Sequence, residues 1–161
     1  MTNWFLLRVL LLLGLQCWQR GVVEAQQAQL NVARNRWNTT THGIVSNNYA
    51  YAYEETLNGV ADADRIIQVQ NGVLTSADAA TISSGAELSD PADYPNVEGM
   101  FGIIQDAIDD DSTVIQARYN QDYGFPTKVS ILYANNQESL EIQIPWLTLY
   151  SVIQLELDRN R

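Results

Sequence analysis

Cysteine is almost absent from this chain of 161 residues, and so are the other side chains that most often serve as nucleophiles or bases. The only cysteine is Cys17, the only histidine is His42 and the only lysine is Lys128. Nucleophilic catalysis requires an activated nucleophile with a base in reach, usually drawn from these residue types. No constellation in the sequence defines a reaction, and we interpret His42, beside Gly43 in a threonine-rich linker, as a surface residue.

No hydrophobic run is long enough to cross a membrane, but residues 1–25 have the pattern of a secretory leader. Arg8 is the only charge before a compact apolar stretch from Val9 to Leu15, and Val23-Glu24-Ala25 is a small-x-small cleavage pattern. We therefore expect a cleaved signal peptide, with an uncleaved signal anchor as the alternative. The mature chain would start near Gln26 and be secreted to the extracellular space, or to the periplasm or cell surface in a bacterium.

Cys17 lies inside this leader, so the mature domain would contain no disulfide. Lipoprotein attachment at Cys17 is disfavoured because Gln16 occupies a position that normally requires a small residue. A chain of this length buries about two thirds of its unfolded surface, which is enough for one self-sufficient domain. We expect residues 26–161 to form that single domain.

Basic residues are scarce: the chain has 9 Lys and Arg against 19 Asp and Glu, a formal net charge of −10. An acidic surface repels nucleic acid and anionic lipid. We therefore expect that the protein does not bind nucleic acid and that, after signal cleavage, it does not associate with a membrane. The charge itself is typical of a soluble secreted surface, and no cofactor is implied.

Apolar periodicity predicts two helices. The first runs from Gln26 to Asn38, and Asn96 caps the second. Asn38-Thr39-Thr40, at the end of the first helix, is a possible glycosylation site in a glycosylating host. The apolar stripes of the two helices are Leu30, Ala33 and Trp37, then Val97, Met100, Phe101, Ile104, Ala107 and Ile108.

Strict alternation from Tyr49 to Glu55 predicts a strand with three phenol rings on one face. Asn71-Gly72 favours positive φ at both turn positions, so residues 65–70 and 73–76 should form an antiparallel hairpin. The segment from Ala77 to Pro95, rich in turn-forming residues, is interpreted as a long surface loop.

Three more alternating strands are expected at residues 113–119, 128–133 and 139–144. Residues 146–157 fit either a strand or a helix, and we favour a final strand. The fold expected is therefore α+β in the order α-β-β-β-α-β-β-β, with two helices packed on one face of a mainly antiparallel sheet. The side chains expected on the opposite, wet face are Arg118, Lys128, Ser130, Glu141 and Gln143.

Several motifs follow one another along the chain: Trp37, Asn48-Tyr49-Ala50-Tyr51, Val69-Gln70-Asn71-Gly72-Val73, Val97-Glu98-Gly99-Met100-Phe101 and the turn from Tyr119 to Pro126. In this order they resemble the exported domains collected as domain-of-unknown-function family 6174. The resemblance covers roughly Ala33 to Ile144 and implies an exported α+β domain, without an activity, substrate or cofactor. Family members often carry a cysteine pair after the first strand. This chain has none there, so no disulfide role transfers.

Carboxylates are the remaining candidates for chemistry. A glycan hydrolase would need two acids about 5 to 10 Å apart, and no motif fixes such a separation. Calcium would need oxygen ligands at a loop spacing that is not present, so no metal site is predicted. The acids considered are Glu54/Glu55, Asp62/Asp64 and Asp90/Asp93 as pairs, and Asp109-Asp110-Asp111 with Glu87, Asp90 and Asp93 as ligands.

Aromatic residues could form a recognition surface. We favour a core position for Tyr49, Tyr51 and Tyr53, and take Tyr119, Tyr123 and Phe125 as the binding candidates. The sequence leads us to expect a noncatalytic secreted domain that binds an extracellular or periplasmic partner, either a protein or a glycan. The surface used would be the loop from Ala77 to Pro95, the turn around Tyr123 or the open face of the sheet. The alternatives are a carboxylate-based glycan hydrolase and a structural cell-surface component.

Overall fold

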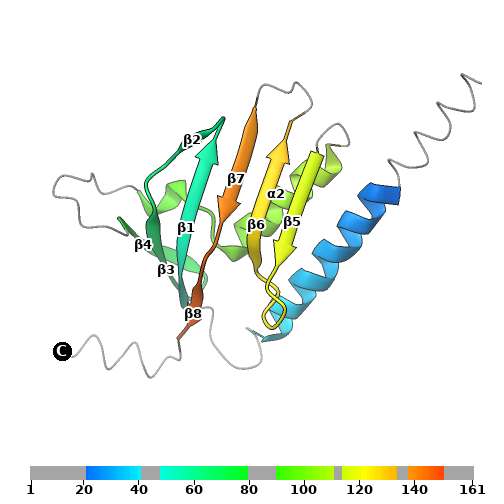
Figure 1. The fold of residues 1–161 in the computed structure, drawn as a ribbon. Helices are drawn as coiled ribbons and strands as arrows, with labels where there is room; N and C mark the ends of the chain where they lie inside the picture. Colours follow the sequence, from blue (N-terminus) through cyan, green and yellow to red (C-terminus); the bar gives the residue numbers. More distant parts are fainter. Residues whose placement is uncertain (1–20, 41–47, 80–89, 111–113, 134–137, 151–161) are drawn as a thin grey trace, which may run out of the picture.

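The computed structural model describes residues 21–40, 48–79, 90–110, 114–133 and 138–150 (Figure 1). Residues 21–40 are helical and are called the N-terminal helix. A 3-10 helix, η1 (Pro91–Asp93), precedes the second helix, α2 (Val97–Asp109). The strands are β1 (Tyr49–Leu57), β2 (Val60–Ala61), β3 (Arg65–Gln70), β4 (Val73–Ala79), β5 (Val114–Tyr119), β6 (Pro126–Leu132), β7 (Ser139–Gln143) and β8 (Leu147–Leu149). The chain is α+β, and the predicted order of helices and strands is confirmed.

The sheet has the order β4-β3-β1-β7-β6-β5, with β2 and β8 also paired to β1. All of its recorded pairings are antiparallel. The long strand β1 pairs with β3 through Tyr49–Tyr53 and with β7 through Glu54–Leu57. β1 therefore joins a first group of strands, β3 and β4, to a second group, β5, β6 and β7, in one sheet. β5 lies at one end of this sheet.

Two Asn-Gly turns shape the first group of strands. Asn71 and Gly72 have φ of 52° and 79°, as the predicted hairpin requires. Asn58 and Gly59 have φ of 53° and 78° and turn β1 into β2, a hairpin that our reading of the sequence missed although the same dipeptide marks it.

Both helices bury their predicted apolar stripes in one core. Leu30, Ala33 and Trp37 are at most 4% exposed, and the six stripe residues of α2 are at most 5% exposed. Figure 1 shows α2 lying across the sheet and the N-terminal helix running alongside β5. Asn96 caps α2 as expected, its Oδ1 accepting from Gly99 N–H at 2.7 Å.

The opposite face of the sheet carries the predicted polar side chains. Arg118 and Gln143 are exposed, and Lys128, Ser130 and Glu141 are half-buried. Lys128 Nζ and Glu141 Oε1 form a salt bridge of 2.6 Å across β6 and β7. This bridge lowers the pKa of Glu141, mainly through the hydrogen bond from Lys128.

The strands keep their predicted places to within two or three residues, and the larger differences from the predicted boundaries lie elsewhere. The first helix extends over residues 21–40, beyond Gln26 to Asn38. The predicted loop from Ala77 to Pro95 is wrong at both ends, because Ala77–Ala79 continue β4 beside β3 and Pro91–Asp93 form η1. Its middle, residues 80–89, lies outside the described residues. Of the predicted strand 146–157, the described part forms β8, and residues 151–157 lie outside the described residues. Where a strand ends depends on its pairing with a neighbouring strand, and the local periodicity of the sequence contains no information about that pairing.

Candidate functional site

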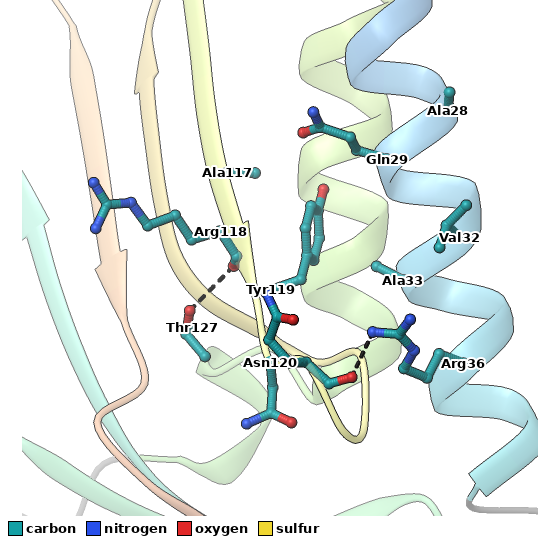
Figure 2. A pocket seen from close by; sticks show the side chains of 11 residues that line it. Ala28, Gln29, Val32, Ala33, Arg36, Ala117, Arg118, Tyr119, Asn120 and Thr127 are labelled. Atoms are coloured by element: carbon teal, nitrogen blue, oxygen red, sulfur yellow. Dashed lines mark hydrogen bonds between the residues drawn. The ribbon is translucent and has the colours of Figure 1, made fainter.

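A groove runs between the N-terminal helix and strand β5 (Figure 2). Its volume is about 720 Å³, which is typical of small-ligand sites. The lining residues are Ala28, Gln29, Val32, Ala33 and Arg36 from the helix, and Ala117, Arg118, Tyr119, Asn120, Gln121 and Thr127 from the strands and their turn. None of them is acidic, although the whole chain has a net charge of −10.

The strand wall of the groove offers main-chain groups because β5 is the last strand of the sheet. Gln26 donates from Nε2 to the carbonyl oxygen of Ile115 at 2.7 Å, so this carbonyl faces the helix. Main-chain groups along an antiparallel strand alternate in direction, so the N–H and C=O of Ala117 face the helix as well. The carbonyl of Arg118 points the other way and accepts from Thr127 Oγ1 at 3.3 Å.

One end of the groove is closed by the turn that joins β5 to β6. Asn120 holds the turn: its Oδ1 accepts from the N–H groups of Asp122 at 3.0 Å and Tyr123 at 2.8 Å. Gly124 then presses against the helix, where an added β-carbon would lie 2.2 Å from the carbonyl oxygen of Ala33. The contact joins main chain to main chain, so this end of the groove cannot open by a side-chain rotation.

Arg36 lies at the closed end. Its Nη1 donates to the carbonyl oxygen of Gln121, and Figure 2 shows the side chain reaching from the helix to the turn. A guanidinium carries five N–H donors. This exposed guanidinium therefore retains donors that can face a ligand in the groove.

Tyr119 supplies the aromatic surface of the groove. Its ring stacks on Phe101, with centroids 6.4 Å apart and planes at 20°. Figure 2 shows the ring between β5 and the helix, with Gln29 reaching toward it. Partial burial raises the pKa of Tyr119 to about 12, so its hydroxyl is a neutral hydrogen-bonding group at physiological pH.

The three predicted binding residues occupy different surroundings. Tyr119 lines the groove. Tyr123 is 38% exposed on the outside of the turn. Phe125 is 4% exposed and packs edge-on against Trp37 with ring centroids 6.3 Å apart, so its ring holds the turn to the helix and offers no surface to a ligand.

The tyrosines of β1 lie in the core, as we favoured. Tyr49, Tyr51 and Tyr53 are at most 3% exposed. Tyr49 Oη accepts from the N–H of Val97 at 3.1 Å, and the Tyr51 hydroxyl donates to the carbonyl of Pro95. Tyr49 and Tyr51 therefore fix the start of α2 on the sheet. A recognition surface built from them does not fit this burial.

The acidic residues form no metal-binding cluster in the described part of the chain. No three Asp, Glu, His or Cys residues there are grouped closely enough to hold a metal ion. Asp90 caps η1 by accepting from Ala92 N–H, and Asp109 accepts from Gln105 Nε2 at 3.0 Å. The ligand candidates Glu87 and Asp111 lie outside the described residues, as does His42, which we interpreted as a surface residue.

Asn38, the possible glycosylation site, lies within the N-terminal helix and is half-buried. The next residue, Thr39, bonds back to the carbonyl of Asn35 at 2.8 Å, in the ordinary manner of a helical threonine. Glycosylation of Asn38 stays a prediction.

Within the described residues, no helix combines the length and the apolar character needed to span a bilayer.

Sequence reasoning missed the helix side of the groove, namely Gln26, Gln29, Val32 and Arg36. These residues lie on a mostly polar helix face and carry no motif. The one local signal is Val32, a large apolar residue that is 60% exposed. The strand order of the sheet is what shows that this face borders an edge of β5 that pairs with no other described strand.

Comparison with known proteins gives a family and no activity. Neither a curated protein nor a solved structure matches the chain. A family model described as "Family of unknown function (DUF6174)" matches residues 29–145, which include α2, all strands from β1 to β7 and most of the N-terminal helix. Because the match covers well over half of the sequence, this chain belongs to the DUF6174 family of unknown function.

Proposed function

We propose that this protein is a noncatalytic binding domain that acts after export, in the extracellular space or periplasm, and that the groove beside β5 is its binding site. The observation that carries the proposal is the groove itself: about 720 Å³ of space bordered by the free edge of a strand. Sites of this size typically combine apolar walls with a few polar groups that fix orientation. Here Val32, Ala28 and Tyr119 supply the walls, and Gln29 and Arg36 supply polar groups.

The chemistry of the lining favours binding over catalysis. General acid–base catalysis is most effective when a group titrates near the working pH. The groove is lined by no carboxylate, histidine, cysteine or lysine. The pKa of Tyr119 is raised to about 12, and arginine stays protonated throughout the accessible range. These groups can orient and hold a ligand, but they do not exchange protons near neutral pH.

Export is supported by the leader-like sequence of residues 1–25, with Arg8 ahead of a short apolar run and a small-x-small cleavage pattern. A domain that holds its fold through a packed core, with no cysteine after Cys17, would not depend on the redox state of its compartment.

Ligand capture tests the proposal. The protein, purified after export from an expressing host, is immobilised and exposed to the native extracellular fraction, and retained molecules are identified by mass spectrometry against a heat-denatured control. We expect one saturable ligand. Gln29→Trp, which fills the groove, should abolish retention, whereas Asn31→Trp, at an exposed position on another side of the same helix, should not. Equal retention by both variants would place the site elsewhere.

A further inference from the structure

We infer that the groove receives the C-terminal end of an extended peptide, which pairs with the free edge of β5 and places its carboxylate on Arg36. This inference rests on the proposed function and specifies the chemical class of the ligand. It follows from three features of the groove: its strand edge, its closed end and its charge.

The strand edge is chemically matched to a peptide. Ile115 presents a carbonyl, and Ala117 an N–H and a carbonyl, on the side of β5 that faces the helix. An extended peptide that adds a strand to a sheet edge bonds to these groups. The carbonyl of Ile115 already accepts from an amide, that of Gln26, at 2.7 Å. The Gln26 side chain thus occupies the place of a peptide N–H and can rotate away when a peptide binds.

The two ends of the groove differ, and this difference selects a chain terminus. At the Gln26 end the described hydrogen bond from helix to strand comes from a side chain, which can rotate aside and let a peptide enter. At the other end Gly124 lies against the main chain of Ala33 and Trp37, which leaves no path onward. The helix rises about 1.5 Å per residue from Gln26 to Ala33, so a strand of about 3.3 Å per residue would fit roughly three residues between these limits. A longer strand could not continue in line with β5 past the turn, so a segment that stays paired along the groove ends there.

Charge selects which terminus this is. Arg36 stands beside the closed end, and among the lining residues there is no acid to receive a terminal amine. A guanidinium binds a carboxylate through charge-assisted hydrogen bonds. The peptide therefore runs parallel to β5, enters past Gln26 and ends with its carboxylate at Arg36. In this register its N–H groups reach the carbonyls of Ile115 and Ala117, and one of its carbonyls reaches Ala117 N–H.

The test uses the protein purified after export and a library of random seven-residue peptides attached through their N-termini, so that the C-terminal carboxylates are free. The same library with amidated C-termini is the matched probe. We expect retention of free-carboxylate peptides, and weakening by at least about tenfold on amidation or in Arg36→Gln. Arg34→Gln is the control variant, because Arg34 does not line the groove and its Nε lies 3.2 Å from Glu98 Oε2. This variant should bind the peptides as the parent does.

The outcomes separate the inference from the proposed function. If amidated peptides bind equally well, or no peptide is retained, while Gln29→Trp still abolishes capture of a ligand from the extracellular fraction, then the groove is a binding site and the peptide inference is wrong. If the Gln29→Trp variant retains peptides and all other ligands as well as the parent does, then both the proposed binding site and the peptide inference are wrong. Melting curves of each variant confirm that it is folded before binding is compared.

Discussion

Gly124 and Ala33 approach so closely that a β-carbon on Gly124 would lie 2.2 Å from the carbonyl oxygen of Ala33. Gly124 also has a φ of 87°, which is in the left-handed region where L side chains are strained. Two independent requirements therefore select glycine at one position. The contact joins the β5–β6 turn to the N-terminal helix and closes one end of the groove, so it links the fold to the proposed site.

Gly124→Ala should destabilise the protein by at least about 2 kcal/mol, since it adds a clash with main chain to the left-handed strain. Gly59→Ala is the matched control. Gly59 has a φ of 78° but nothing within 4 Å of an added β-carbon, so it reports the strain alone. Thermal unfolding of both variants measures the difference. Equal losses would show that the turn does not press against the helix.

Gly102→Ala should stabilise the protein by about 0.5–1 kcal/mol. Gly102 lies inside α2, an added β-carbon meets nothing within 4 Å, and alanine loses less backbone entropy in a helix. Gly99→Ala should gain less, because its β-carbon would lie 3.3 Å from Pro95 Cβ. Chemical denaturation measures both changes, and a loss of stability in Gly102→Ala would contradict the open space described at that position.

Much of the fold could be predicted from local patterns, because burial imposes a period on each element. The stripe from Val97 to Ile108 and the alternation of Tyr49, Tyr51 and Tyr53 each describe a single face, and both faces are buried as expected. The Asn71-Gly72 turn was predictable for a similar reason, since its backbone angles depend on two adjacent residues.

The groove could not be predicted in this way. It forms because β5 is at the end of the sheet and the N-terminal helix lies beside it, and both facts depend on contacts between residues far apart in the sequence. The turn from Tyr119 to Phe125 was informative in the sequence for a structural reason: Gly124 and Phe125 attach it to the helix. Of the predicted binding residues, Tyr119 lines the groove, where Arg36 and Gln29 join it.

Tyr51→Ala should cost about 3–5 kcal/mol, because the ring is fully buried and its loss leaves a cavity between β1 and α2. Tyr51→Phe keeps the ring and removes only the hydrogen bond to Pro95, so it should cost about 1 kcal/mol. Tyr123→Ala, on the exposed turn, should change stability by no more than about 0.5 kcal/mol. Denaturant midpoints rank the three variants. If Tyr51→Ala melted like the parent, the ring could not be part of the core.

Alkaline pH should unfold the protein. Burial raises the pKa of Tyr49 from 10.0 to about 12, although the bond from Val97 partly opposes this, and burial also raises the pKa of Tyr51 and Tyr53. In the unfolded chain these phenols release protons near pH 10, so the unfolded state then binds fewer protons than the folded state. Stability is therefore complete below about pH 10 and falls as pH rises toward 12. Circular dichroism and tyrosinate absorbance should change together. Ionisation of all tyrosines without loss of structure would contradict the burial of these three.

Arg65→Met should leave the protein as stable as the parent or more so. Arg65 is 9% exposed on β3, on the buried side that it shares with Ile67 and Val69, and its Nε has no hydrogen-bond partner among the described residues. A buried guanidinium whose Nε–H lacks a partner carries a desolvation cost, and methionine fills similar space without that cost. Arg34→Met removes the same charge from an arginine that pairs with Glu98, and so controls for the change in net charge. Melting temperatures decide the comparison. Both variants lower the net charge by the same amount. A melting temperature several degrees lower in Arg65→Met but not in Arg34→Met would therefore mean that the Arg65 guanidinium itself stabilises the fold.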